Sequence, residues 1–290
     1  MTDIRQRFFI HECPVRGEVV HLEESLQTIL NQRDYPQAIK ILLGEMLVAT
    51  ALLASTLKIQ GRLSLQIQGK NKLKWAMAEC NHLCELRALA DFEPDDIFNT
   101  GTDSSVALKH LGDGVLFINI EPEFGERYQG IIPREHDTLS ECLVQYYDLS
   151  AQIPTRLKFA STTERAGGLL IQLLPRTEEE KETIDQDLWP RLQILTDTTK
   201  AEELTDLPPQ EILYRLYNEE DVRLPESDLL KFGCTCSKER CADALLQIGE
   251  AAVKETLLEQ NPIVMDCQFC NTSYRFNAEE ALGLFGQHLS

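Results

Sequence analysis

Four cysteines near the C-terminal end constrain this 290-residue chain more than any other feature. They form a Cys-x-Cys pair, Cys234 and Cys236, and a Cys-x-x-Cys pair, Cys267 and Cys270. Four thiolates complete the tetrahedral shell that zinc prefers, and two close pairs separated by about thirty residues are typical of zinc sites. The nearest histidine is His288, at the extreme C-terminus. The simplest assignment is therefore one zinc ion held by four cysteines.

The spacing leaves two roles open for such a site. A segment of about sixty residues buries little core, so the zinc could simply stabilise a small domain. Alternatively, the site could be a redox switch, because oxidants attack thiolates and each half has a possible disulfide partner next to it in sequence. Oxidation could then close two local bridges and release the metal in one event.

Charge and cysteine content limit the class of protein. The chain has 28 Lys and Arg against 47 Asp and Glu, a net charge of −19. This balance disfavours a nucleic-acid partner held through phosphate contacts. The N-terminal sequence lacks the apolar core of a signal peptide, and nine cysteines without a secretion signal suggest a reducing compartment. We therefore expect a cytoplasmic protein.

Residues 1–175 mix helical and strand periodicities. The apolar stretch 39–57 contains Lys40 and Glu45, so it is predicted to be a buried helix rather than a membrane span. Helical spacing recurs at 26–30 and 139–146. Paired strands are predicted at 63–67 with 73–77, 115–120 with 128–132, and 157–159 with 169–173. Hairpins with isolated helices indicate an α+β domain of antiparallel sheets.

Residues 176–230 differ in composition, with 16 acidic and 6 basic residues and a net charge of −10. Apolar repeats predict two short helices, at 188–195 and at 212–217 after Pro208-Pro209. Short helices are marginal alone and depend on what they pack against. We therefore expect a helical acidic linker of low intrinsic stability.

The zinc-binding domain is expected to span residues 231–290. Ser237 is predicted to cap a helix, and a second helix follows through Val253 and Leu257. The Cys267–Cys270 turn is predicted to join strands at 263–265 and 274–276. Asn277 and Glu280 together resemble a capping box for a last helix.

Five cysteines lie outside the four-cysteine motif. Cys84 is predicted to share a core-facing strand side with Leu86, and Cys142 to pack on an apolar helix face. Cys241 is expected to face its helix interior, and a redox side role for it is left open. Cys80 and Cys84 are too loosely spaced to indicate a second metal site, and no role is assigned to Cys13.

No enzyme is predicted. The chain has no Walker motif and no GxGxxG, and Gly167-Gly168 is interpreted as a turn. The six histidines are scattered, and the 47 carboxylates are too many for any pair to be singled out as catalytic.

Several long stretches resemble one protein family. They are LLGEMLVATALLASTLK (42–58), GERYQGIIP (125–133), AGGLLIQLLP (166–175), LPPQEILYRLY (207–217) and CTCSKERCADAL (234–245). All are similar to the thirty-three-kilodalton heat-shock proteins of bacteria, also called redox-regulated 33 kDa chaperonins. The resemblance extends over nearly the whole chain.

The resemblance implies an ATP-independent holdase of the bacterial cytoplasm that captures unfolding proteins under oxidative stress. It implies a reduced, inactive form with one zinc on Cys234, Cys236, Cys267 and Cys270. It further implies that oxidation forms the Cys234–Cys236 and Cys267–Cys270 disulfides, releases the zinc and unfolds the linker. The active form would be a homodimer, and neither nucleic acid nor a membrane is an expected partner.

Two other classes remain to be distinguished from this one. A zinc-ribbon regulator of nucleic acid should carry a basic stripe, yet residues 231–290 have 5 basic and 8 acidic residues. A thiol–disulfide oxidoreductase usually places its Cys-x-x-Cys at a helix N-terminus near a βαβ unit. Here the pair is predicted to join two short strands.

Overall fold

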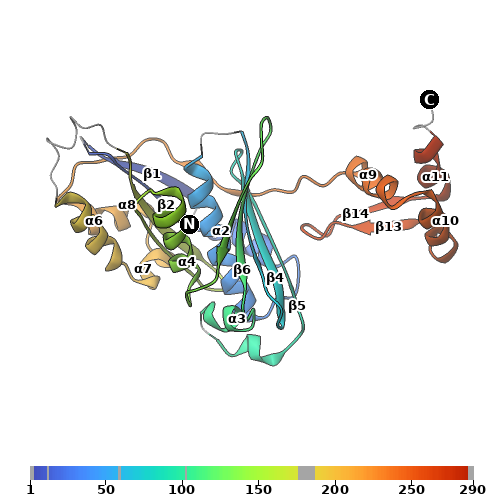
Figure 1. The fold of residues 1–290 in the computed structure, drawn as a ribbon, viewed down its shortest axis with the longest axis horizontal. Coiled ribbons are helices and arrows are strands. Elements are labelled where there is room, and N and C mark those ends of the chain that lie inside the picture. The colour runs from blue at the N-terminus through green and yellow to red at the C-terminus, as the bar shows by residue number, and fades with distance from the viewer. Residues whose placement is uncertain (1–2, 12, 58–59, 102, 176–186, 287–290) are drawn as a thin grey trace. The chain divides into compact units, whose positions relative to one another are not determined.

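The chain divides into two units, Met1–Gly233 and Cys234–Ser290. The computed structural model describes residues 3–11, 13–57, 60–101, 103–175 and 187–286 (Figure 1). The acidic segment from residue 187 onward belongs to the first unit, and its beginning, 176–186, lies outside the described residues. The division into 1–175, 176–230 and 231–290 stays a prediction about how the chain folds. The predicted α+β class, with antiparallel sheets and helices, is confirmed.

The first sheet of the first unit is antiparallel throughout. Its strands run in the order β10 (Val222–Arg223), β1 (Ile4–Ile10), β2 (Val15–Leu22), β9 (Ala166–Leu173) and β8 (Thr155–Ser161), and β11 (Asp228–Leu229) also pairs with β1. The predicted pairing of 157–159 with 169–173 is confirmed by β8 and β9. The sequence interpretation missed β1 and β2, since neither has a simple alternation of buried and exposed positions.

The second sheet contains the two other predicted hairpins. Its order is β12 (Lys231–Phe232), β5 (Glu85–Phe92), β4 (Leu73–Asn81), β3 (Gly61–Gln68), β6 (Val115–Pro122) and β7 (Tyr128–Pro133). The β3–β4 and β6–β7 pairs confirm those predictions. Only β12 pairs in parallel, with β5, among the described strands of this sheet.

Helix α2 (Gln37–Ser55) packs against strands of both sheets and supplies much of the main core (Figure 1). It is long and apolar enough to cross a membrane, but 78% of that apolar window is buried inside the protein. The prediction of a buried helix is therefore confirmed. The other helical segments of this part are α1 (Glu24–Leu30), the 3₁₀ segment Asp96–Asn99, α3 (Ser105–Lys109), α4 (Leu139–Tyr146) and the π-helical turn Tyr147–Ala151.

Three short helices of the acidic segment cover the first sheet and form a second core with it. They are α6 (Leu188–Asp197), α7 (Ala201–Asp206) and α8 (Pro209–Tyr217). Leu192, Leu204 and Leu213 pack there with Phe8 and Ile171 of the sheet. Both predicted helices are confirmed, and α7 is additional. The described part of the acidic segment thus hides an apolar sheet surface.

Gly167-Gly168 is not a turn, and that prediction was wrong. Both residues lie inside β9. A Cβ at Gly167 would lie 1.8 Å from the carbonyl oxygen of Leu204 in α7, and a Cβ at Gly168 would lie 2.5 Å from Val48 Cγ1 in α2. The two glycines allow both covering layers to approach the strand closely.

The prediction for Cys84 is correct in that the residue packs against the main core, but its predicted place on a strand was wrong. Leu86 is fully buried, but Cys84 lies one residue before β5 in a left-handed conformation, with φ of 60°. Its half-buried thiol accepts a hydrogen bond from Arg5 Nη2 at 3.3 Å. The predicted core position of Cys142, on α4, is confirmed.

The second unit combines α9 (Lys238–Ile248), α10 (Glu250–Glu259), β13 (Ile263–Asp266), β14 (Ser273–Phe276) and α11 (Ala278–Gly286). Its core is small and consists of Leu245, Val253, Ile263, Phe276 and Ala281. Ser237 caps α9 by accepting from Arg240 N at 3.2 Å. Asn277 and Glu280 form the predicted reciprocal capping contacts, at 3.0 and 2.8 Å.

Candidate metal centre

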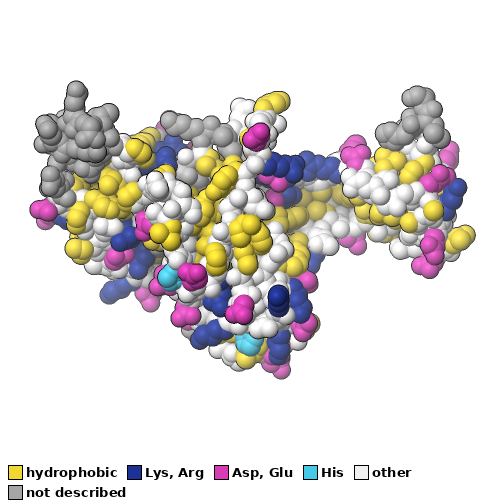
Figure 2. Space-filling view, viewed as in Figure 1, with side chains coloured by type: hydrophobic (Ala, Val, Ile, Leu, Met, Phe, Trp, Pro, Cys, Tyr) yellow, Lys and Arg dark blue, Asp and Glu magenta, His cyan; other side chains and the backbone are white. Residues whose placement is uncertain are grey.

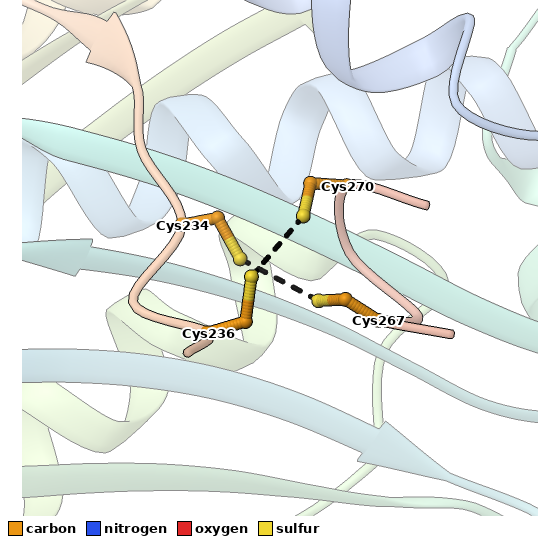
Figure 3. Close-up of side chains that lie close together, drawn as sticks. All are labelled: Cys234, Cys236, Cys267 and Cys270. Atoms are coloured by element: carbon orange, nitrogen blue, oxygen red, sulfur yellow. Dashed lines mark hydrogen bonds between the residues drawn. The ribbon is translucent and has the colours of Figure 1, made fainter. Parts of the chain in front are cut away.

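The second unit brings the four motif cysteines together (Figure 3). Their sulfur atoms all lie within 4.8 Å of one another. Cys234 Sγ is 3.6 Å from Cys267 Sγ, and Cys236 Sγ is 3.3 Å from Cys270 Sγ. In the part of the chain that the structure describes, no other group of three or more Cys, His, Asp or Glu side chains meets in this way.

The Cys-x-Cys half is held by the start of α9. The backbone is irregular from Gly233 to Ser237, and the Ser237 cap then fixes the helix entrance. Arg240, in the first turn of α9, donates from Nη1 to Thr235 Oγ1 at 2.7 Å. Thr235 lies between the two cysteines, so this contact stabilises the bend that aims both sulfurs at one point.

The Cys-x-x-Cys half is the turn of the β13–β14 hairpin. Asn271 N donates to Cys267 O at 2.8 Å, and Cys267 N donates to Thr272 O at 2.9 Å. Asn271 has φ of 55°, a left-handed conformation that asparagine tolerates better than most residues. These bonds close the turn and point both sulfurs to the same side.

Two hydroxyl groups contact the sulfur cluster. Tyr274, on β14, donates its hydroxyl to Cys236 Sγ at 3.2 Å. Thr272 Oγ1 lies 3.2 Å from Cys270 Sγ. The sequence interpretation treated Tyr274 only as a strand residue and did not discuss Thr272. The one signal in the sequence that could have placed Tyr274 and Thr272 at the cysteine cluster is that both lie within four residues of Cys270.

The four thiols do not ionise alike. Burial raises the pKa of Cys234 to about 12 and also raises the pKa of Cys236. Burial opposes ionisation of Cys270 too, but hydrogen bonds with Thr272, Cys236 and Cys267 together outweigh it and lower its pKa to about 6. Crowded thiolates repel one another, so ionising all four together requires a cation among them.

The donor set fits zinc. Four sulfurs at Zn–S bonds of about 2.3 Å would be about 3.8 Å apart in a regular tetrahedron. The sulfur–sulfur distances of 3.6 Å (Cys234 to Cys267) and 3.3 Å (Cys236 to Cys270) are close to that value, and no two of the four sulfurs are more than 4.8 Å apart. Thiolates also favour zinc over calcium or magnesium, which prefer oxygen ligands.

The remaining candidates do not join this cluster. Cys13, Cys80, Cys84 and Cys142 belong to the first unit, and His288 lies outside the described residues. Cys241 lies on α9 and packs, half-buried, against the small core. All nine cysteines are in the described ranges, and none forms a disulfide there.

Comparison with known proteins gives one consistent result. The sequence profile of the family described as Hsp33 protein matches residues 3–277. A 33 kDa chaperonin of Shewanella denitrificans is 39% identical over 286 residues, covering 99% of this chain and 96% of that protein. One from Ectopseudomonas mendocina is 42% identical, covering 98% and 96%. The crystal structure of the Thermotoga maritima 33 kDa chaperonin has a TM-score of 0.86 at 20% identity, covering 100% and 99% of the two chains. That structure supports the likeness of the fold.

Proposed function

The chain belongs to the Hsp33 family, and from this premise we propose that it is a redox-regulated, ATP-independent holdase of the cytoplasm. Its partners would be unfolding proteins that accumulate under oxidative stress, and its active form a homodimer. The relatives are named chaperonins, which supports a binding role rather than an enzymatic one.

The reduced form would hold one zinc ion through Cys234, Cys236, Cys267 and Cys270. Bound zinc would neutralise the thiolates and stabilise a unit whose own core is small. Oxidation would close the Cys234–Cys236 and Cys267–Cys270 bridges, because loop closure favours partners that are near in sequence. The observation that carries this proposal is the meeting of four sulfurs from two such neighbouring pairs.

The acidic segment supplies the proposed response. Helices α6, α7 and α8 are short, and the segment's net charge of −10 repels itself when compact. Such a segment lies near the folding threshold, where roughly one or two kcal/mol decides the outcome. Its melting would expose the apolar face of the first sheet, which would become a surface for client proteins.

Residues 228–233 link the acidic segment directly to Cys234, so a backbone change at the cysteine cluster can be transmitted to that segment along the chain. Asp228, in β11, forms an ion pair with Arg5 of β1 at 2.7 Å. Gly233 N donates to Leu86 O at 3.1 Å, directly before Cys234. Closing the Cys234–Cys236 bridge would bend the backbone next to these contacts and loosen the C-terminal anchor of the acidic segment.

Exposed apolar side chains on the visible face of the first unit form several separate groups. Polar and charged side chains lie between these groups (Figure 2). Strong client binding would therefore require the larger surface beneath α6, α7 and α8.

The alternative of a thiol–disulfide oxidoreductase is less well supported. The Cys267–Cys270 pair lies in a β-hairpin turn and not at a helix N-terminus. The zinc-ribbon alternative is disfavoured by the acidic composition of the second unit.

The decisive experiment measures how well the protein suppresses aggregation of a thermally unfolding client. Oxidised, zinc-free protein should suppress it, and reduced, zinc-loaded protein should not. A variant with all four motif cysteines replaced by serine should lose the dependence on oxidation, whereas Cys13→Ser should keep it. Equal suppression by both wild-type forms would contradict redox regulation. Turnover of a small disulfide substrate would favour the oxidoreductase.

A further inference from the structure

Tyr274 connects the two halves of the cysteine cluster through a hydrogen bond. It lies on β14, four residues after Cys270, so it moves with the Cys-x-x-Cys hairpin. Its hydroxyl nevertheless donates to Cys236 Sγ, in the Cys-x-Cys half, at 3.2 Å. The half-buried ring packs against the small core, and Tyr274 pairs with Met265 across the hairpin. The phenol is therefore held in place and does not reach the sulfur by chance.

We propose that Tyr274 sets the order in which the two cysteine pairs oxidise, by shielding the Cys236 sulfur until the Cys267–Cys270 bridge has formed. The inference rests on the proposed redox switch and assigns a positioning residue to it. The residue would act through a sulfur and would take no part in electron transfer.

The shielding follows from how thiolates react. A thiolate attacks the oxidant with a lone pair on sulfur, so a hydrogen bond to that sulfur draws electron density away and slows the attack. Hydrogen bonds from residues around a metal site tune its ligands in the same way. A phenol is more acidic than an alcohol and therefore the stronger donor. At Cys270 the contact runs the other way in the thiol form, since Cys270 Sγ donates to Thr272 Oγ1, and the Thr272 hydroxyl can donate only once Cys270 is a thiolate. As the weaker donor, Thr272 should then restrain Cys270 less than Tyr274 restrains Cys236.

The chemistry of each step balances with hydrogen peroxide as the oxidant. Two thiolates lose two electrons and form one S–S bond, the O–O bond of the peroxide breaks, and two protons from solvent complete two water molecules. The first step joins Cys267 and Cys270 and removes two of the four sulfur ligands. The hairpin can then part from the Cys-x-Cys half and take the Tyr274 hydroxyl with it. Cys236 thereby becomes fully nucleophilic, and the second step joins it to Cys234.

Backbone strain in a Cys-x-Cys bridge would delay the second step as well. The two causes predict the same order in the wild-type protein, but they differ in a variant that loses only the hydroxyl. Tyr274→Phe keeps the ring and its packing and leaves the Cys-x-Cys backbone unchanged. Strain would preserve the delay in this variant, whereas shielding by Tyr274 would not.

The test uses zinc-loaded, reduced full-length protein and less than one equivalent of hydrogen peroxide. Free thiols are then alkylated, and mass spectrometry gives the ratio of Cys234–Cys236 to Cys267–Cys270 bridges. Tyr274→Phe should raise this ratio roughly five-fold, the effect of losing one ordinary hydrogen bond. Zinc competition titration should show a loss of affinity of about 10-fold.

Two further variants keep the test decisive. Thr272→Val removes the hydroxyl at Cys270 and should lower the ratio, the opposite change. Site-specific 3-fluorotyrosine at position 274 is a stronger donor with nearly the same shape, and it should lower the ratio too. It also serves as the readout if Tyr274→Phe fails to fold.

The outcomes separate this inference from the proposed function. The inference is overturned if the wild-type protein forms both bridges and releases zinc, while Tyr274→Phe and the fluorinated protein give the wild-type ratio. If the wild-type protein forms neither bridge and keeps its zinc, the proposed switch itself fails, and the inference falls with it.

Discussion

The two faces of the first sheet are both buried, but by very different covers. One face packs on α2, a 19-residue helix whose buried side chains are almost all apolar. The other face is covered by α6, α7 and α8, which have 10, 6 and 9 residues and include five acidic and two basic side chains. Long apolar helices are stable in a core, whereas short charged helices depend on their neighbours. From this difference we expect α2 to stay in place when α6, α7 and α8 are released.

The largest effect is expected from the proposed zinc ligands. Cys267→Ser removes one of four thiolates, so zinc affinity should fall by roughly 100-fold or more, because binding at such sites supplies on the order of 10 kcal/mol of folding free energy. Competition with a chromogenic chelator measures the change. Cys13→Ser and Cys84→Ser are the controls and should leave one zinc per chain. An unchanged affinity in Cys267→Ser would remove that residue from the site.

Leucine truncation should distinguish the two covers. Leu47 of α2 and Leu213 of α8 are both buried, and either change to alanine leaves a cavity worth about 2–5 kcal/mol. Leu47→Ala should lower the free energy of unfolding of the whole first unit, as measured by urea denaturation. Leu213→Ala should instead release the acidic helices and give aggregation suppression in the reduced, zinc-loaded protein. If both variants changed unfolding free energy and aggregation suppression alike, α2 and the acidic helices would not differ in how readily they are released.

Adjacent glycines allow a finer comparison on a single strand. Gly167→Ala would drive a methyl group into the Leu204 carbonyl of α7, and Gly168→Ala would drive one into Val48 of α2. Overpacking typically costs about 1–3 kcal/mol. We expect Gly167→Ala to increase proteolysis within 187–217 and leave the main thermal transition in place. Gly168→Ala should lower the melting temperature of that transition, and the reverse pattern would contradict the assignment of the two faces.

The smallest effect is expected from His21, on β2. Its Nε2 donates to Thr205 O in α7 at 3.0 Å, and its buried Nδ1 has no hydrogen-bond partner in the described structure. Burial lowers the pKa of His21, although Thr205 and the nearby Asp3 and Glu23 carboxylates act in the opposite direction. As the pH falls below about 6.5, the pKa of histidine in the unfolded chain, His21 therefore takes up a proton in the unfolded state before it does so in the folded state.

The sign of the pH effect follows from that difference. The contribution of His21 to stability is complete above about pH 6.5 and is lost as the pH falls toward its lower folded pKa, by at most about 1.4 kcal/mol per pH unit. Urea denaturation at pH 7.5 and 5.5 should show a larger acid loss for the wild type than for His21→Asn. If His21→Asn lost as much unfolding free energy between pH 7.5 and 5.5 as the wild type, or more, His21 would not be the source of the pH effect.

The sequence was sufficient for the elements whose patterns are local. Alternation in 63–67 and 73–77, the apolar run of α2 and the caps at Ser237 and Asn277 all depend on neighbouring residues. The gathering of the four cysteines in one cluster could likewise be predicted, because ligand spacing reflects the geometry of the metal.

What could not be predicted depends on long-range packing. Glycine is needed at Gly167 and Gly168 inside β9 because helices α7 and α2 approach the strand from either side, which no local signal shows. Cys84 lies in a turn beside Arg5, a residue 79 positions away. Tyr274 contacts Cys236 across 38 positions, so its role at the sulfur appears only after folding.

Hydrogen exchange on reduced, zinc-loaded and oxidised, zinc-free protein tests the contrast between the two covers most directly. Amides of α6, α7 and α8 should lose protection on oxidation, while those of α2 keep it, because in the proposed mechanism only the acidic cover depends on the switch. The contradicting result is equal protection of 187–217 in both states while the oxidised protein suppresses client aggregation. The client surface would then lie outside the face that these helices cover.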